Sequence, residues 1–452
     1  MDTNLPEIEV LEKARDFAGA VERLKALLKE SQGDEDIAFK LACNLLSLGR
    51  VSESLPLFEM TALHGDAPPE RKLNYGHALK AAGSYEKAAD QYYYLAQNPD
   101  HKVSASAYWS LANLKRYKFS DKDKSDIEIR LRDSKVGQGY VGLYRLTLAD
   151  AFDQSCQYEK AFAELEAGNN SIGEIRPFRG DLYQKLIKEL ISDFQRSSVK
   201  CAEHGRCPIF VVGLPRSGST LVEQILSSHS QVNSTDELLF ISDIAKELGE
   251  KGNYAAVVSG LPEQDAYQLG EAYLQKIAGY SKNSELHFVD KTPENFVHVG
   301  LIKTIFPNAK IIDVHRDPLD NALSLYKQFF AQGREYSYSL NAIVFYWQGY
   351  LTLMKHWQSQ YSGEIFRLDY EKLVTNPKES ISKLLSYCGL HEEPSCFAPH
   401  KSPRPVLTPS AAQVTMPISS SSLGSGQNYK EYVTEYLPKF AQLKRVAASI
   451  DL

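Results

Sequence analysis

One short loop carries residues that suit a phosphate. An apolar, β-branched run at 208–212 predicts a strand; the sequence GLPRSGST follows it at 213–220, and an apolar helical face comes next. Strand, glycine-containing loop and helix in this order offer an anion free backbone amides and the positive end of a helix dipole. The alternative interpretation is a tight strand-to-helix turn with a serine N-cap.

The spacing of this loop is that of a phosphate loop, G-x-x-x-x-G-x-[ST], with one change. Ser219 stands where a lysine is expected. Nucleotide hydrolases use that lysine to reach the β- and γ-phosphates of a magnesium-bound triphosphate. The serine therefore disfavours an NTPase or a kinase and, together with Arg216, favours a single phosphate held without a metal.

Two further strand ends carry candidate anion ligands. Lys291 follows the β-type run at 287–289, and Arg316 follows the run at 310–314, with Ser324 two turns into the next predicted helix. The carboxyl ends of parallel strands meet at one edge of a sheet, so these side chains are expected near the loop. From the pattern alone, Lys291 could equally be a surface lysine, and Arg316 could merely pair with the aspartates that start its helix.

Helix-start signals follow both of these strand ends. Thr292 is expected to cap a helix whose first residue is Pro293, and Asp317 is expected to cap one that begins at Pro318. More widely, β-type runs at 209–212, 287–289, 310–314 and 365–368 alternate with helical segments. This alternation predicts a parallel sheet covered by helices, with its ligand site at the carboxyl ends of the strands.

The first half of the chain is helical by its period and repeats every 34 residues. Turn residues recur at 15–17, 49–51 and 83–85, each followed by a small and then a bulky residue: Ala20, Ser54 and Ala88, then Leu24, Phe58 and Tyr92. The pattern resembles tetratricopeptide repeats, with a fainter copy at 158–162 and an interruption near 121–133. An unrelated helical bundle is the alternative. Either architecture favours a scaffold or partner-binding role for this half.

Length and composition predict two domains, 1–195 and 205–452. The chain has 452 residues, 43% of them hydrophobic and 24% charged, and a formal charge of -6, which argues against a nucleic-acid binder. We expect no secretory signal and no membrane span, because no stretch reaches about 20 apolar residues. The six cysteines are scattered with no C-x-x-C pair, so reduced thiols, a cytoplasmic location and no metal site are expected.

Taken together, the loop at 215–220, DKTP at 290–293 and HRDP at 315–318 with Ser324 resemble the donor-binding elements of sulfotransferases that use 3'-phosphoadenosine-5'-phosphosulfate (PAPS). The resemblance covers about 208–437. It is greatest to the protein-tyrosine sulfotransferase branch and to bacterial sulfotransferases with N-terminal tetratricopeptide repeats. It implies an α + α/β fold, in which a tetratricopeptide-like helical solenoid precedes a parallel-sheet domain with a P-loop-like loop.

The resemblance also implies a role for each matching residue. Lys291 and Ser410 would flank the transferred group, and Glu237 would take the proton of the acceptor. The PAPS-binding positions would be Arg216, Ser217, Gly218, Ser219 and Thr220 around the 5'-phosphosulfate, Arg316 and Ser324 at the 3'-phosphate, and Tyr370 at the nucleotide. A carboxylate base, a cation and loop amides are the groups that an in-line transfer needs.

Two departures from the family pattern stand out. The stretch SLGSGQNY at 422–429 lacks the usual basic and aromatic pair, so a 3'-phosphate contact and a stacking partner for adenine are missing unless Lys430 or Tyr429 replaces them. Leu238 and Phe240 stand where tyrosine-protein sulfotransferases carry a basic side chain facing acidic peptides. The second departure argues against a peptide tyrosine as the acceptor.

Two functions follow as hypotheses. The first is a PAPS-dependent sulfotransferase that modifies an acceptor hydroxyl, with protein or peptide tyrosine among the candidates and with the repeats recruiting the acceptor or a partner. The alternative is a catalytically weak nucleotide-binding protein that acts mainly as a repeat-based interaction module. Glu237, Lys291 and Ser410 favour the first, whereas Ser425 and Gly426 favour the second.

Overall fold

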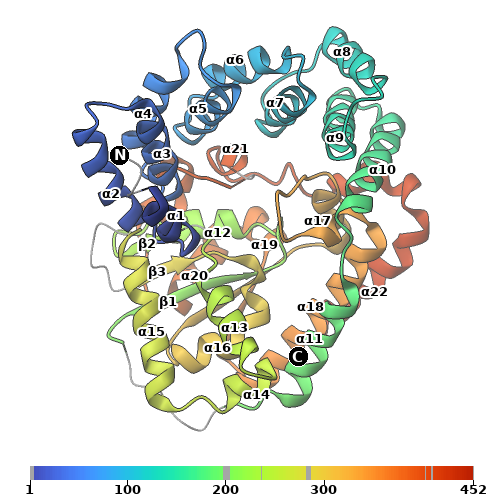
Figure 1. Ribbon diagram of the computed structural model, residues 1–452. Coiled ribbons are helices and arrows are strands. Elements are labelled where there is room, and N and C mark those ends of the chain that lie inside the picture. Colours follow the sequence, from blue (N-terminus) through green and yellow to red (C-terminus); the bar gives the residue numbers. More distant parts are fainter. Residues whose placement is uncertain are drawn as a thin grey trace. The chain divides into compact units, whose positions relative to one another are not determined.

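The computed structural model describes residues 5–196, 204–235, 237–280, 287–402, 404–408 and 411–450 (Figure 1). The chain divides into two compact units. The helical unit comprises Met1–Ser171, Lys276–Lys282 and Pro403–Ala412; the sheet unit comprises Ile172–Gln275, Asn283–Ser402 and Gln413–Leu452. The domain limits 1–195 and 205–452 stay a prediction.

The helical unit is built from consecutive helices, drawn from blue to cyan in Figure 1. They are α1 (Leu5–Lys13), α2 (Phe17–Glu30), α3 (Glu35–Ser47), α4 (Val51–Ala62), α5 (Pro69–Ala81), α6 (Tyr85–Ala96), α7 (His101–Asn113), α8 (Asp121–Leu131), α9 (Gln138–Gln154) and, across the unit boundary, α10 (Tyr158–Ile175). From α2 to α7, each helix packs against the next one along the chain.

The 34-residue period is present in the structure. Helices α2, α4 and α6 begin at Phe17, Val51 and Tyr85, directly after the three predicted turns. The small residues and the bulky residues of the repeat are all fully buried: Ala20, Ser54, Ala88, Leu24, Phe58 and Tyr92. Small side chains let helices approach closely, and bulky ones fill the space between them. The segment expected to interrupt the array instead forms α8, capped by Ser120 and Asp123.

Five parallel strands form the sheet of the second unit, in the order β2-β3-β1-β4-β5. They are β1 (Cys207–Gly213), β2 (Val232–Ser234), β3 (His287–Asp290), β4 (Lys310–His315) and β5 (Ile365–Asp369). The four predicted strands are confirmed, and β2 is additional. Because β1 is central and covered on both faces, all but its first residue are buried.

The remaining helices follow in chain order; most belong to the sheet unit, and α15 and α21 each have residues in both units (Figure 1). They are α11 (Gly180–Asp193), α12 (Ser219–Leu226), α13 (Phe240–Glu250), α14 (Tyr254–Ser259), α15 (Glu263–Ala278), α16 (Val299–Ile305), α17 (Pro318–Tyr326), α18 (Leu340–Gln360), α19 (Tyr370–Thr375), α20 (Pro377–Cys388), α21 (Ala411–Val414) and α22 (Leu437–Ala448). Short 3-10 helices are η1 (Pro293–His298), η2 (Glu335–Tyr338), η3 (Pro394–Phe397), η4 (Pro399–Lys401), η5 (Ser425–Tyr432) and η6 (Thr434–Tyr436). The predicted fold class, α + α/β with a P-loop-like parallel-sheet domain, is confirmed.

One of the two predicted helix caps is correct. Asp317 caps α17, its carboxylate accepting from the backbone amide of Leu319 at 3.0 Å. Thr292 precedes a 3-10 helix and makes no cap hydrogen bond. Its buried hydroxyl instead lies 2.8 Å from the carbonyl oxygen of Leu238 and 2.8 Å from Asp290 Oδ1. Within the described part of the chain, no helix has the length and apolar character needed to cross a membrane.

Candidate active site

The loop after β1 has positive φ angles at Arg216 and Gly218, which restrict the residue types that it can accept. Gly218 closes it with a φ of 105°, and a Cβ atom there would overlap the ring of Tyr370. Arg216 also has a positive φ, 68°, which is uncommon for a residue with a side chain. Asn321 of α17 fixes the loop from outside, because its amide donates to the carbonyl oxygen of Pro215 at 2.9 Å. The loop is thus held in one strained shape ahead of α12.

The predicted donor residues form one group, which we call the donor cluster: Arg216, Ser324, Arg316 and Tyr370. Arg216 Nε donates to Ser324 Oγ at 3.1 Å, and Arg316 Nη1 donates to the carbonyl oxygen of Arg216 at 3.1 Å. The guanidinium of Arg316 lies 4.9 Å from the ring centroid of Tyr370. Side chains that follow the ends of β1, β4 and β5 therefore meet, together with Ser324 of α17.

The donor cluster concentrates positive charge in a buried place. Burial, with the nearby charge of Arg316, lowers the pKa of Arg216 to about 10. Arg316 itself is only 7% exposed, and among the described residues neither its Nε nor Ser217 Oγ has a hydrogen-bond partner. Buried polar groups are normally satisfied, so these atoms indicate a missing acceptor. One buried and one partly buried arginine beside unsatisfied donors are suited to an anion of more than one charge.

The chain at 422–429 lies against the donor cluster. Arg316 Nη2 donates to the carbonyl oxygen of Ser422 at 3.0 Å, and the hydroxyl groups of Ser422 and Tyr370 lie 2.7 Å apart. The Asp320 carboxylate accepts from the backbone amides of Gly424 and Gly426, each at 2.7 Å. The segment around residues 425–426, where the sequence departs from the family pattern, is therefore held in place by the Asp320 carboxylate.

Tyr429 and Lys430, the two residues proposed to replace the missing family contacts, differ in exposure. Tyr429 is fully buried, and Lys327 Nζ lies 4.0 Å from the centroid of its ring. Lys430 is exposed. A stacking role for Tyr429 would require this packing to open.

A second group, the proton-transfer cluster, surrounds the predicted base. It consists of Glu237, Lys291, Arg334 and Glu294. Lys291 Nζ lies 2.7 Å from Glu237 Oε1, and Arg334 Nη2 lies 3.0 Å from Glu237 Oε2. Arg334 also pairs with both carboxylate oxygens of Glu294, with Nη2 to Oε2 at 3.0 Å. Burial alone would raise the pKa of Glu237, but the Lys291 and Arg334 cations lower it to about 2.

Two members of this neighbourhood carry no motif in the sequence. Arg334 lies in a loop after α17, 97 residues from Glu237. Glu223 lies on α12 with Oε2 3.7 Å from Lys291 Nζ, and the side chains of both residues are completely buried. A glutamate inside an otherwise apolar helical face was the available signal for Glu223; Arg334 had none, because only folding brings it to the site.

The remaining predicted site residues are placed as follows. Ser217, Ser219 and Thr220 are buried in the loop and the first turn of α12. Lys291 directly follows β3, at the carboxyl end, as predicted. Ser410 lies outside the described residues.

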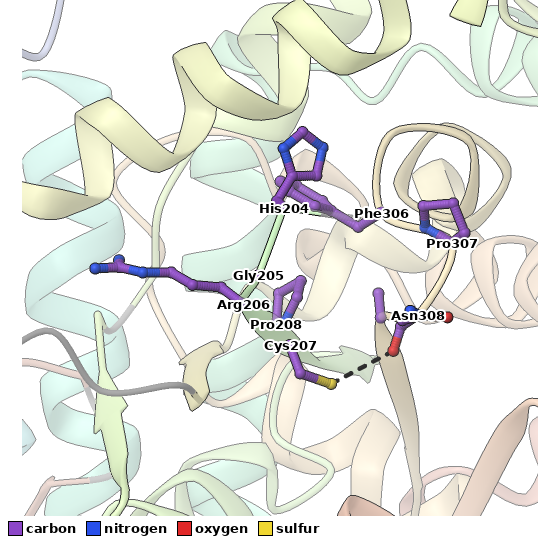
Figure 2. A pocket seen from close by; sticks show the side chains of 9 residues that line it. His204, Gly205, Arg206, Cys207, Pro208, Phe306, Pro307 and Asn308 are labelled. Atoms are coloured by element: carbon purple, nitrogen blue, oxygen red, sulfur yellow. Dashed lines mark hydrogen bonds between the residues drawn. The ribbon is translucent and has the colours of Figure 1, made fainter. Parts of the chain in front are cut away.

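A separate pocket of about 250 Å³ lies at the opposite edge of the sheet, where β1 and β4 begin (Figure 2). His204, Arg206 and Cys207 line it, and Cys207 Sγ donates to the carbonyl oxygen of Asn308 at 3.4 Å (Figure 2). None of the predicted site residues lines this pocket. Substitutions near this pocket can therefore serve as controls for substitutions at the carboxyl ends of the strands.

Residues 208–394 match the sulfotransferase family. This region belongs to that family. The match begins with β1 and contains the loop, Glu237, Lys291, Arg316 and Tyr370.

Two curated proteins are similar to this chain, with different sequence identity and coverage. An uncharacterised protein of Aquifex aeolicus is 31% identical over 373 residues, which cover 79% of this chain and 48% of that protein. A Caenorhabditis briggsae protein, provisionally named a protein-tyrosine sulfotransferase, is 24% identical over 185 residues, covering 40% of this chain and 65% of that protein. The chain thus spans about half the length of the first relative and under two thirds of the second.

Among solved structures, the sulfotransferase domain of the Synechococcus PCC 7002 olefin synthase is 18% identical with a TM-score of 0.40, covering 57% of this chain and 98% of that domain. A sulfotransferase of Mycobacterium avium is 13% identical with a TM-score of 0.31, covering 71% of this chain and 97% of that one.

Proposed function

We propose that this sulfotransferase moves a sulfuryl group from PAPS to an acceptor hydroxyl. The observation that carries the proposal is the donor cluster, in which the partly buried Arg216 and the buried Arg316 lie together and, among the described residues, neither Arg316 Nε nor the nearby Ser217 Oγ has a hydrogen-bond partner. PAPS offers a phosphosulfate and a second phosphate. The resemblance assigns the phosphosulfate to the loop around Arg216 and the 3'-phosphate to Arg316 and Ser324.

The proton-transfer cluster would perform the transfer. PAPS supplies a sulfuryl group whose bond to the 5'-phosphate oxygen breaks as the acceptor oxygen bonds to sulfur. Glu237 takes the hydroxyl proton, and Lys291 together with Ser410 stabilises the charge around the transferred group. With a pKa near 2, Glu237 is ionised at neutral pH and can accept that proton. Its two cations weaken it as a base, so we expect Glu237 to disengage from Lys291 when the acceptor binds.

We propose that the donor binds without a metal, because the guanidinium groups of Arg216 and Arg316 would balance its negative charge. A kinase-type triphosphate site is disfavoured, because Ser219 replaces the lysine that would reach the outer phosphates. The catalytically weak alternative is also not favoured, since Glu237 and Lys291 are held in contact at 2.7 Å.

The acceptor is proposed only as a class. Its reactive group is a hydroxyl, and peptide tyrosine is one candidate, as the name of the Caenorhabditis briggsae relative suggests. The helical unit, read as tetratricopeptide-like repeats, would recruit the acceptor or a protein partner. We place the reaction in the cytoplasm, since all five cysteines within the described residues are free thiols. No nucleic-acid partner is proposed.

Ligand-dependent thermal unfolding tests the donor. We expect adenosine 3',5'-bisphosphate to raise the Tm of the full chain, ATP to raise it less, and Arg216→Ala to abolish the difference, because a ligand that binds only the folded protein stabilises it. Stabilisation by ATP alone, or by neither nucleotide, would contradict the proposal.

A further inference from the structure

Among the described residues, two carboxylates that form ion pairs with Lys291 Nζ within 4 Å differ in exposure. Glu237 Oε1 is 2.7 Å from Lys291 Nζ, and the Glu237 side chain is 30% exposed. Glu223 Oε2 is 3.7 Å from the same atom, and its side chain is sealed from solvent. Ser234 donates a hydrogen bond to the other oxygen of Glu223, which fixes the direction of that carboxylate. One carboxylate can therefore meet a substrate and the other cannot.

This difference matters when Glu237 takes a proton. Protonation neutralises the carboxylate nearest to Lys291, and Lys291 is itself completely buried. An ammonium left without a counter-ion inside a protein costs several kcal/mol, so it would lose its proton or move. The carboxylate of Glu223, whose Oε2 lies 3.7 Å from Lys291 Nζ, would remain as its counter-ion, because no acceptor can reach this buried side chain.

We propose that Glu223 is a positioning residue, the permanent counter-ion that keeps the Lys291 ammonium charged and in place while Glu237 is protonated or disengaged. The inference rests on the proposed function for its catalytic consequence. Glu223 acts through Lys291 and touches no substrate. It also lies on α12, one turn after the loop that would hold the donor, and so ties the position of Lys291 to that loop.

Unfolding measurements test the charge arrangement without any substrate. Neutralising only Glu237 (Glu237→Gln) leaves Lys291 paired with Glu223, so we expect a small loss of Tm. Neutralising both (Glu223→Gln with Glu237→Gln) should lower Tm by at least about 3 °C more than the two single losses together. Additive losses would overturn the proposal. If Glu223→Gln does not fold, adding Lys291→Met must restore folded protein; no restoration would equally overturn it.

Kinetics test the consequence for the reaction. We expect Glu223→Gln to lower kcat about tenfold or more while KM for PAPS stays within about twofold, because the binding loop is untouched. Glu223→Asp, which keeps the charge, should recover part of the loss. Gln224→Met changes a neighbouring buried polar residue of the same helix and should retain the parental kcat. Parental kcat in Glu223→Gln, or a parallel rise in KM, would contradict the role.

The two failures can be told apart. If the parental chain transfers no sulfuryl group from PAPS to any hydroxyl tested, the proposed function falls. The unfolding series still decides whether Glu223 holds Lys291, since it needs neither donor nor acceptor.

Discussion

The donor cluster and the proton-transfer cluster hold their charges in opposite ways. In the donor cluster, two cations lie together, the partly buried Arg216 and the buried Arg316, and Arg316 Nε has no hydrogen-bond partner among the described residues. In the proton-transfer cluster, the two cations Lys291 and Arg334 alternate with two carboxylates, those of Glu237 and Glu294. On the proposed function, a bound anion would neutralise the cations of the donor cluster and accept its unsatisfied hydrogen bonds. In the proton-transfer cluster the positive and negative charges already balance, so the ion pairs of Glu237 must separate before Glu237 can act as a base. Binding and chemistry should therefore respond differently to the loss of one charge.

The largest effect is expected at the base. Glu237→Gln keeps the shape of the side chain and removes its ability to take a proton, so kcat should fall about 10²–10⁴-fold. Binding of adenosine 3',5'-bisphosphate, measured by calorimetry, should stay near the parental value because the donor cluster is intact. Glu271→Gln, which alters a glutamate paired with His204 at the opposite edge of the sheet, is the control. Equal turnover in Glu237→Gln and the parent would exclude Glu237 as the base.

The next largest effect is expected in donor binding. Arg316→Ala removes a buried cation, and charge-assisted hydrogen bonds of about 1.5–3 kcal/mol predict a Kd for adenosine 3',5'-bisphosphate raised about 10- to 100-fold. Arg206→Ala removes the same charge from the pocket in Figure 2 and should leave this Kd unchanged. If the two variants weaken binding equally, the effect is one of net charge and the donor cluster is not the site.

The contrast between the clusters also explains what the sequence could predict. The loop at 213–220, Lys291 and Arg316 each follow an apolar run that is long enough to be recognised as a strand, and parallel pairing then brings their ends together. The position of the loop, of Lys291 and of Arg316 at the carboxyl edge of the sheet could therefore be predicted from local pattern. Strand β2 was missed because three residues give no periodic signal.

The balancing charges were not accessible in this way. Arg334 reaches Glu237 from a loop distant in sequence, and Glu223 pairs with Lys291 only because folding brings α12 close to the residue that follows β3. Thr292 was assigned to a helix cap on local preference, but its hydroxyl bonds to Asp290 and Leu238 instead. Local propensity yields to tertiary packing wherever a polar group is buried and needs a partner.

A smaller effect, of predictable sign, is expected on pH dependence. The pKa of Glu237 is about 2 in the folded chain, below the ordinary 4.5, so its ionised form stabilises the fold at neutral pH, and this stabilisation is lost as the pH falls from about 4.5 through about 2. Arg334→Gln removes one of the cations that lower this pKa. The variant should therefore lose less Tm than the parent on acidification.

The control for this measurement is Arg445→Gln, which removes an exposed arginine of α22. This variant should lose as much Tm on acidification as the parent. A steeper loss in Arg334→Gln than in the parent would mean that Arg334 does not lower the pKa of Glu237.

The smallest effect is expected where a carboxylate meets the donor cluster. Asp320→Asn leaves one oxygen to accept from Gly424 or Gly426 but not both, so the segment at 422–429 should hold Arg316 less firmly. Loss of one such bond, about 0.5–1.5 kcal/mol, predicts a Kd for adenosine 3',5'-bisphosphate raised about 2- to 10-fold, measurable by calorimetry. The same substitution removes a negative charge near a proposed phosphate site, which acts in the other direction. An affinity equal to or above the parental one would mean that Asp320 opposes the donor through its charge more than it supports Arg316 through the segment.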